Sequence, residues 1–339
     1  MNFVVAGIGT WGREWAELLA GHSETAVVAT VDVAPNAAIW SKNRLDVPCF
    51  QSLDVALDAV AADAVLIVTN PGQHKPLLLT ALQRGKHVLC EKPMVASWAE
   101  AFEVECALKS SQSTAMVAQG YRFLESAAEV RHRLAGGEIG TLRAVKIRFR
   151  RHLPDVISQP DHPIYALPHS ILLDMSVHHF DLLRYMTQRE VLSILAMEHD
   201  TPDNAFTHAS NAICILRLTD DLPVVWDGDW CARGPITSWE GEWQFIGSTG
   251  RLYWDGMLNK TGLTSVRLER PRQTPQEIRS DEPILERRIP VVNHFVASIK
   301  NGVQPEPSVA DNRRTLAAVF GAIKSVEEKR EIVLAKGEL

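Results

Sequence analysis

Several features that mark other classes of protein are missing from this sequence. Its five cysteines are odd in number and form no CxxC pair, which indicates reduced thiols. No apolar run approaches the roughly 18–20 residues that span a bilayer, and the N-terminus lacks the basic region of a signal peptide. With Lys+Arg 35 against Asp+Glu 41, the net charge of −6 argues against a nucleic-acid binder. These absences predict a cytoplasmic protein with no nucleic-acid and no membrane partner.

The length and the apolar content predict two globular domains. A chain of 339 residues exceeds the size at which one hydrophobic core usually stops growing. Its hydrophobic fraction of 46% is that of an ordinary globular protein and excludes intrinsic disorder. Strands and helices alternate in the first third of the chain, whereas strands joined by short turns predominate later. We therefore expect one domain over 1–120 and a second over 121–339.

A glycine-rich turn follows the first predicted strand. A short apolar run, typical of a buried parallel strand, leads into Gly7, Gly9 and Gly12 in the order GxGxxG. A helical stretch comes next, and a second strand, Ala26–Val31, ends at Asp32, twenty residues after Gly12. A turn without a ligand is the alternative, since such hexamers arise by chance. The strand–turn–helix context and the spacing to the aspartate favour a dinucleotide-binding fingerprint.

Each residue type in this fingerprint has a physical reason. Gly7 allows the tight turn, Gly9 lets the backbone approach a pyrophosphate, and Gly12 permits close packing of helix on strand. The N-terminus of the helix offers free N–H groups and the positive end of its dipole to the phosphates. Asp32 would accept hydrogen bonds from the ribose hydroxyls and repel a 2′-phosphate, and no arginine stands beside it in the sequence. The pattern therefore predicts NAD as the cofactor, in preference to NADP.

Two further loops lie where a parallel sheet binds its ligand. A buried strand over 63–69 is followed by a loop that includes His74, and a strand over 86–90 ends in Glu91-Lys92-Pro93. Between them we expect a helix over 75–84, ended by a glycine. Alternating strand–helix units imply a parallel sheet whose carboxyl-end loops bind the ligand. His74 and Lys92 are therefore candidate site residues.

The second half of the sequence predicts an open, largely antiparallel sheet. Residues 143–150 alternate strictly, with Lys146, Arg148 and Arg150 on one face that serves either an interface or solvent. Short turns separate the further expected strands, 212–218, 224–230, 242–246, 251–254 and 265–268. We expect a mobile loop from Arg270 to Pro283 and a final helix at about 308–329. The fold class is thus an α/β N-terminal Rossmann domain followed by an α+β C-terminal domain.

Three polar side chains share one face of a helix predicted around residue 178. Asp174 and His178 are spaced i, i+4, and Asp181 lies three residues further on. A carboxylate beside an imidazole raises its basicity and fixes its ring, which suits a general base near neutral pH. A structural hydrogen bond is one alternative for this pair, and a metal site with His169 and His179 is another. Adjacent histidines on a helix point about 100° apart, so we predict no metal.

These motifs together resemble the glucose–fructose oxidoreductase / inositol dehydrogenase / rhizopine catabolism (Gfo/Idh/MocA) oxidoreductase family. The resemblance rests on the fingerprint, the loop from Thr69 to His74, the Glu-Lys-Pro segment and the Asp-x-x-x-His-x-x-Asp motif that begins at Asp174. It extends over most of the chain, and it implies a Lys92-Pro93 peptide that is often cis. The residues that the resemblance assigns to the cofactor are Gly7, Gly9, Thr10, Trp11, Gly12, Asp32, Thr69, Asn70, His74, Glu91 and Lys92.

The resemblance implies an NAD(P)-dependent oxidoreductase acting on CH–OH groups. Such an enzyme oxidises a secondary alcohol of a sugar, inositol or related polyol by hydride transfer. His178 would take the hydroxyl proton, Lys92 would bind the same oxygen and Asp174 would orient them, with Asp181 supporting the helix. A non-catalytic NAD(P)-binding regulatory or sensor protein of the same fold is the alternative.

Two further expectations follow from the family. Its C-terminal sheet often forms subunit contacts, which implies a homodimer or homotetramer through that sheet. The sequence departs from the family at Leu167-Pro168-His169-Ser170, where a glycine pair is usual. This departure alters the wall of the substrate site and leaves the choice of sugar or polyol open.

Overall fold

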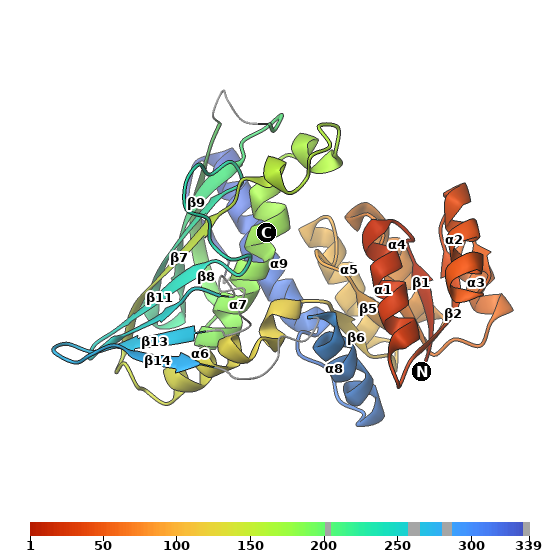
Figure 1. Ribbon diagram of the computed structural model, residues 1–339, viewed down its shortest axis with the longest axis horizontal. Helices are drawn as coiled ribbons and strands as arrows, with labels where there is room; N and C mark the ends of the chain where they lie inside the picture. Colours follow the sequence, from red (N-terminus) through yellow and green to blue (C-terminus); the bar gives the residue numbers. More distant parts are fainter. Residues whose placement is uncertain (201–204, 257–264, 280–286, 335–339) are drawn as a thin grey trace. The chain divides into compact units, whose positions relative to one another are not determined.

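The protein divides into two compact units, each built on a sheet of its own. The computed structural model describes residues 1–200, 205–256, 265–279 and 287–334, which Figure 1 shows as a ribbon. One unit contains Met1–Gly120 and Leu285–Arg313, and the other contains Tyr121–Ile284 and Arg314–Leu339. The first unit therefore takes in a segment from near the end of the chain.

In the described residues, the sheet of the first unit is parallel throughout. Its strands are β1 (Asn2–Ala6), β2 (Ala26–Val31), β3 (Cys49–Phe50), β4 (Ala64–Ile67), β5 (His87–Cys90) and β6 (Ala115–Val117). They lie in the order β3-β2-β1-β4-β5-β6. The chain runs outward from β1 to β2 on one side and returns to β4 on the other, so the switch point of this doubly wound sheet lies between β1 and β4. The apolar residues of β1, β4 and β5 are buried, as their apolar runs predict, and the predicted Rossmann fold is confirmed.

Helices pack on this sheet through apolar positions at helical spacing. They are α1 (Thr10–Gly21), α2 (Pro35–Leu45), α3 (Leu53–Ala59), α4 (His74–Gln83), α5 (Trp98–Lys109) and α8 (Arg288–Lys300). Helix α1 buries Trp15 and Leu19, which lie four residues apart on one face. Helix α8, which the sequence analysis did not predict, contacts α1, and its Phe295 ring lies 6.0 Å from that of Phe3 in β1. A helix from the end of the chain thus completes the core of the first unit.

The second unit contains, in its described residues, a nine-stranded sheet. Its strands are β7 (Leu142–Arg150), β8 (Val191–His199), β9 (Asn211–Leu218), β10 (Pro223–Asp229), β11 (Glu242–Gly247), β12 (Arg251–Trp254), β13 (Ser265–Glu269), β14 (Gln276–Arg279) and β15 (Ile332–Val333). The order is β14-β13-β12-β11-β7-β10-β9-β8-β15, and of these pairs only β7 with β10 is parallel. The predicted open, largely antiparallel sheet is confirmed.

One expectation in this sheet is wrong in part. The loop predicted from Arg270 to Pro283 contains β14, and its residues 280–283 lie outside the described residues. Strand β14 has a single apolar residue, Ile278, which lies opposite Val266 of β13. The hydrophobic pattern is therefore too weak to reveal the strand, whose backbone hydrogen bonds come from its neighbour.

Helices cover one face of the second sheet (Figure 1). They are α6 (Glu125–Ala135), α7 (Val177–Thr187) and α9 (Val309–Glu328), of which α9 belongs to this unit from Arg314 onward. Phe180 of α7 packs edge-on against Trp226 of β10, with 5.8 Å between ring centroids. Alternate residues of β7, β9 and β10 are buried on the helix side and exposed on the other. Within the described ranges, no helix has both the length and the apolar character that crossing a membrane requires.

Candidate functional site

The glycines of the fingerprint differ in what surrounds them. Gly7 has a φ of +95°, and a Cβ there would lie 2.6 Å from the carbonyl oxygen of Val68. A Cβ on Gly12 would lie 1.9 Å from the carbonyl oxygen of Gly7, whereas one on Gly9 would meet no atom within 4 Å. The fold itself therefore requires glycine at positions 7 and 12. The space beside Gly9 is open to a ligand.

The N-terminus of α1 presents amide groups that no side chain caps. Its N-cap residue is Gly9, and the first turn contains no acidic residue. Thr10 and Trp11 begin the helix, and both are exposed. Uncapped N–H groups and the positive end of the helix dipole attract an anion. This end of α1 fits the pyrophosphate of a dinucleotide.

Asp32 lies directly after β2, and backbone amides orient its carboxylate. The amide of Ile8 donates to Oδ2 at 2.6 Å, and the amide of Ala34 donates to Oδ1 at 2.8 Å. Each carboxylate oxygen has two lone pairs, so both retain the capacity to accept a further hydrogen bond. Asp32 is thus held beside the glycine turn in a form suited to the two hydroxyls of a ribose.

The Glu91 carboxylate joins α1 to the loop that carries Lys92. The indole N–H groups of Trp11 and Trp15 donate to its Oε1 at 2.8 and 2.7 Å, and the backbone amide of Lys92 donates to its Oε2 at 3.0 Å. Glu91 is 9% exposed. The Lys92-Pro93 peptide is cis, as the resemblance implies. Three donors therefore fix the backbone at the point where the Lys92 side chain begins.

The imidazole of His74 connects the loop after β4 to the loop after β5. Its Nε2 lies 2.9 Å from the carbonyl oxygen of Thr69, and its Nδ1 lies 2.9 Å from that of Pro93. The side chain is 1% exposed, and burial lowers the pKa of His74 below its usual value. Asn70, next to Thr69, is exposed. His74 thus ties the loop after β4 to the loop after β5 from inside the protein.

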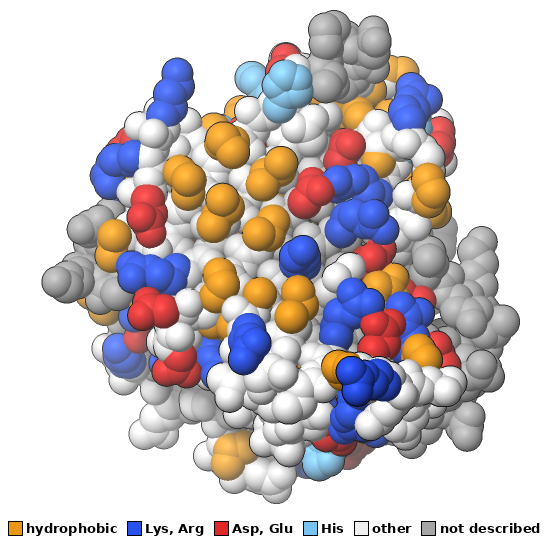
Figure 2. Space-filling model, turned by 90° about the vertical axis from the view of Figure 1, so that its left-hand side faces the viewer, with side chains coloured by type: hydrophobic (Ala, Val, Ile, Leu, Met, Phe, Trp, Pro, Cys, Tyr) orange, Lys and Arg blue, Asp and Glu red, His pale blue; other side chains and the backbone are white. Residues whose placement is uncertain are grey.

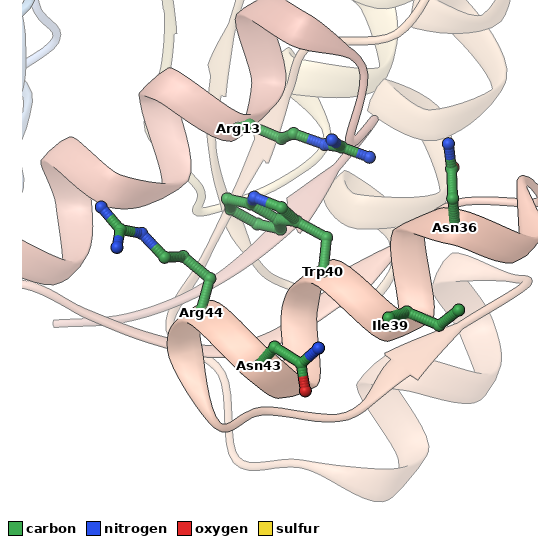
Figure 3. A pocket seen from close by; sticks show the side chains of 6 residues that line it. All are labelled: Arg13, Asn36, Ile39, Trp40, Asn43 and Arg44. Atoms are coloured by element: carbon green, nitrogen blue, oxygen red, sulfur yellow. The ribbon is translucent and has the colours of Figure 1, made fainter.

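A cavity of about 380 Å³ lies between α1 and α2 (Figure 3). Its lining side chains are Arg13, Asn36, Ile39, Trp40, Asn43 and Arg44. The Arg13 guanidinium lies over the Trp40 ring, 5.5 Å from its centroid, and Arg13 Nε donates to the carbonyl oxygen of Ile8 at 3.2 Å. Ile8 therefore binds both side chains, because its amide donates to Asp32 and its carbonyl oxygen accepts from Arg13. The fold thus brings the Arg13 cation toward Asp32, whose neighbours in the sequence include no arginine.

The candidate base, His178, follows a turn of π-helix. The π-helical residues, Leu172–Ser176, include Asp174, and α7 continues from Val177. Residue spacing predicted a single α-helix here, because it does not reveal the wider i→i+5 turn. His178 is 9% exposed, and its ring stacks on Tyr121 with 4.5 Å between centroids. An aromatic neighbour that the sequence analysis did not identify therefore lies against the plane of the imidazole.

Asp181 forms a buried ion pair that anchors α7. Its Oδ2 accepts from Arg122 Nε at 2.5 Å, and its Oδ1 accepts from the Arg122 guanidinium at 2.7 Å. The Thr315 hydroxyl of α9 donates to Oδ1 at 3.1 Å. Asp181 is 1% exposed, so water does not screen the pair. The supporting role predicted for Asp181 is confirmed.

Two other histidines near α7 have partners inside the second unit. Trp226 Nε1–H donates to Nδ1 of the buried His179 at 3.0 Å, and His179 Nε2–H donates to the carbonyl oxygen of Trp239 at 3.1 Å. Burial lowers the pKa of His179 to about 4, so this ring is neutral at pH 7. His169 has a φ of +52°, and its hydrogen bond to Glu198, 2.7 Å long, raises its pKa. In the part of the chain that the structure describes, no group of three His, Cys, Asp or Glu residues could hold a metal ion.

Sequence reasoning missed one charged residue that interacts with Tyr121, the ring that stacks on His178. Residues 145, 147 and 149 of β7 are buried, and Arg151 is the next position of the same alternation. Its guanidinium lies over the Trp239 ring, 4.7 Å from the centroid, and interacts electrostatically with Tyr121 and Glu240. Burial lowers the pKa of Arg151. The alternation predicts an apolar residue at position 151, so the charge there was a signal from which Arg151 could have been identified.

The predicted site residues belong to both units. Lys92 and the residues assigned to the cofactor lie in the first unit, and Asp174 and His178 lie in the second. Within the first unit, the carboxyl ends of β1, β2, β4 and β5 bring the glycine turn, Asp32, Thr69 and Glu91 to one edge of the sheet. The catalytic and cofactor roles of the individual residues stay predictions.

Known proteins similar to this chain include two curated relatives that align over nearly its whole length. The myo-inositol 2-dehydrogenase of Thermotoga maritima is 25% identical over 98% of each chain. The inositol 2-dehydrogenase of Rhizobium meliloti is 26% identical over 99% of each. A solved scyllo-inositol dehydrogenase from Lactobacillus casei, with bound NAD(H) and scyllo-inositol, matches at a TM-score of 0.81 and 20% identity over 99% of each chain. That structure shows the same fold.

Family models match both halves of the chain. Residues 1–119 match the model of an oxidoreductase family with an NAD-binding Rossmann fold, which confirms the predicted cofactor. Residues 127–253 match the model of the GFO/IDH/MocA C-terminal domain. The chain therefore belongs to the Gfo/Idh/MocA family of NAD-binding oxidoreductases.

Proposed function

We propose that the protein is an NAD-dependent dehydrogenase that oxidises a secondary alcohol of a sugar, inositol or related polyol. The observation that carries the proposal is the presence of Lys92, Asp174 and His178, each in its family motif, on a chain with an NAD-binding domain. The names of the two full-length relatives support the same class of substrate. A sensor of the same fold, the rival function, needs no acid–base group.

The proposed roles follow from the chemistry of the side chains. The His178 imidazole takes the proton of the substrate hydroxyl while the Tyr121 ring holds its plane. The Lys92 ammonium donates a hydrogen bond to the same oxygen and stabilises the negative charge that develops there. Asp174 orients these groups through its carboxylate. Bound NAD supplies the nicotinamide carbon that accepts the hydride.

We assign the cofactor contacts to the residues at the carboxyl edge of the parallel sheet. The uncapped amides at Gly9, Thr10 and Trp11 would bind the pyrophosphate, and Asp32 would bind the adenosine ribose. Thr69, Asn70 and Lys92 would line the rest of the cofactor, with the buried His74 and Glu91 holding their loops. The proposal makes 1–120 the NAD-binding domain, to which the unit boundaries add Leu285–Arg313, and the remainder of 121–339 the domain for substrate and assembly. The five free cysteines support a cytoplasmic location.

Replacing the base tests the proposal. His178→Asn keeps hydrogen-bonding capacity but removes the base, so kcat on a polyol that the wild type oxidises should fall by about 10²–10⁴-fold with NADH affinity unchanged. In the wild type, protonation of the base should lower kcat/KM at acid pH. In His178→Asn this pH dependence should be absent. Lys92→Met should be at least as damaging, and the two losses should combine less than additively. Asp174→Asn should be milder.

The exposed His132 of α6 supplies the matched control, since His132→Asn removes an imidazole from the surface of the same unit. It should leave kcat unchanged. Near-normal turnover by His178→Asn would show that the proton leaves by another route. If the wild-type protein binds NADH but none of a broad panel of polyols supports the reduction of NAD+, the result would favour the sensor function over the dehydrogenase.

We also propose a homodimer or homotetramer formed through the outer face of the C-terminal sheet. Figure 2 shows apolar side chains gathered on this face. Met197 lies opposite Ile213, and Val225 lies opposite Ile215, and each of these side chains is exposed. Contiguous exposed apolar surface marks interaction sites. Light scattering should show an oligomer that Ile215→Lys dissociates, and a wild-type monomer at micromolar concentration would contradict the proposal.

A further inference from the structure

A charged residue, Arg151, directly follows β7 and continues the series of its covered face. Val145, Ile147 and Phe149 alternate along the strand, and each is buried. Successive residues of a strand point to opposite faces, so the next position of this series is Arg151, whereas Arg150 faces the other way. Residues on a covered face are normally apolar, so a guanidinium at this position requires a partner that offsets the cost of its desolvation.

Arg151 differs from the other covered arginines of the second unit. Arg122 binds both oxygens of Asp181, and Arg184 binds both oxygens of Glu190. Among the described residues, the Arg151 guanidinium forms no hydrogen bond and no ion pair, and its Nε is buried without a partner. Glu240 acts on it only through space. A partly buried guanidinium in this state favours an anion that the described chain does not provide.

The surroundings of Arg151 connect it to the proposed base. Its guanidinium lies over the Trp239 ring, 4.7 Å from the centroid, a contact that uses the face of the cation and not its terminal N–H groups. It interacts electrostatically with the Tyr121 hydroxyl, and the Tyr121 ring stacks on His178. One tyrosine thus stacks on the base and interacts electrostatically with the guanidinium. A substrate that extends from His178 along Tyr121 would meet Arg151.

We propose that the substrate is a sugar acid, an aldonate or a uronate, whose carboxylate binds Arg151 while its carbinol binds His178. The inference rests on the proposed function and narrows its substrate class from polyols in general to anionic ones. A planar guanidinium matches a carboxylate with two parallel hydrogen bonds, which a neutral hydroxyl cannot reproduce. In the reaction the carbinol is oxidised to a ketone and NAD+ is reduced to NADH. The hydroxyl proton passes to His178, and the carboxylate is unchanged.

Substrates that share a carbon skeleton and differ in charge test the inference. We would compare D-gluconate with sorbitol, and D-galacturonate with D-galactose, by following NADH formation. The wild type should favour the acid of a pair by about tenfold to hundredfold in kcat/KM, the contribution of a hydrogen bond between charged groups. Arg151→Gln should abolish this preference by raising KM for the acid, with the neutral compound unaffected. Arg151→Lys should restore part of it.

Arg133→Gln is the matched control. It removes another partly buried guanidinium of the second unit, one that pairs with Glu129 and Glu138. This variant should keep the wild-type preference for the acid. Equal use of both members of each pair by the wild type, or an equal loss on both in Arg151→Gln, would overturn the inference and leave the proposed function standing.

A binding measurement separates failure of the inference from failure of the proposed function. With NADH present, D-gluconate should raise the Tm of the wild type and of Arg133→Gln but not that of Arg151→Gln. This result would support the carboxylate site even if no compound were oxidised, in which case the dehydrogenase proposal alone would fail. No rise in the wild type would count against the carboxylate site.

Discussion

Two glycines at the start of α1 should respond differently to substitution by alanine: Gly12→Ala should lower the stability of the fold, and Gly9→Ala should weaken cofactor binding. A Cβ on Gly12 would lie 1.9 Å from the backbone oxygen of Gly7, so α1 must move away from the turn. Overpacking of this kind costs about 1–3 kcal/mol, and a backbone atom cannot turn aside as a side chain can. Gly12→Ala should therefore lower the Tm of the cofactor-free protein by several degrees.

Gly9→Ala should leave the cofactor-free fold intact. The backbone of Gly9 has φ −70° and ψ −173°, which alanine adopts without strain, and its Cβ would meet no atom within 4 Å. The unfolded chain loses freedom, so the free energy of unfolding should stay constant or rise by about 0.4–1 kcal/mol. The methyl group would occupy the space that we assign to the pyrophosphate. The Kd for NADH should therefore rise at least about tenfold, the loss of one charge-assisted hydrogen bond.

Thermal unfolding of the free protein and fluorescence titration with NADH measure the two effects separately. Gly21→Ala is the control, since Gly21 ends the same helix and its Cβ would also meet nothing within 4 Å. It should leave the Kd unchanged and, like Gly9→Ala, keep or slightly raise the Tm. A wild-type Kd in Gly9→Ala would refute the placement of the pyrophosphate, and a wild-type Tm in Gly12→Ala would refute the close approach of the helix.

Three further predictions address the ion pairs and the cofactor. Asp181→Asn removes the buried carboxylate that binds Arg122 and should destabilise the second unit by about 3–5 kcal/mol in denaturant unfolding, whereas Asp46→Asn in an exposed pair should have no measurable effect. The pKa of His169 is raised by Glu198, so its ion pair stabilises the fold fully below the unfolded pKa of about 6.5 and is lost as pH rises through the folded pKa. His169→Gln should thus lower the Tm more at pH 6 than at pH 9, and an equal loss at both would contradict the pairing. Asp32→Ser with Val33→Arg should shift the ratio of Kd values from NADH toward NADPH, and a wild type that binds both equally would show that Asp32 does not face the ribose.

The cofactor domain could be predicted from the sequence because its signals are local. Burial of both faces of a parallel strand requires an apolar run, and the limits of Ala26–Val31 are the same in the sequence analysis and in the structure. The glycine turn, Asp32 and the Glu91-Lys92-Pro93 segment each lie within a few residues of a strand end, where sequence position already indicates the ligand edge. The alternation of 143–150 likewise revealed β7.

The tertiary structure alone decided how these segments support one another. Trp15 and Glu91 are 76 residues apart, and only folding brings the indole to the carboxylate that fixes the backbone of Lys92. The π-helical turn at Asp174 leaves the sequence spacing unchanged, so no periodicity reveals it. The sequence analysis did not single out Arg151, and only the fold places it over Trp239 and lets it interact with Tyr121. Local patterns set the strands and the cofactor edge, because backbone pairing and burial follow short-range periodicity. The partners of a buried charge such as Glu91 include residues far away in the chain, so only the tertiary structure determines which residues pair.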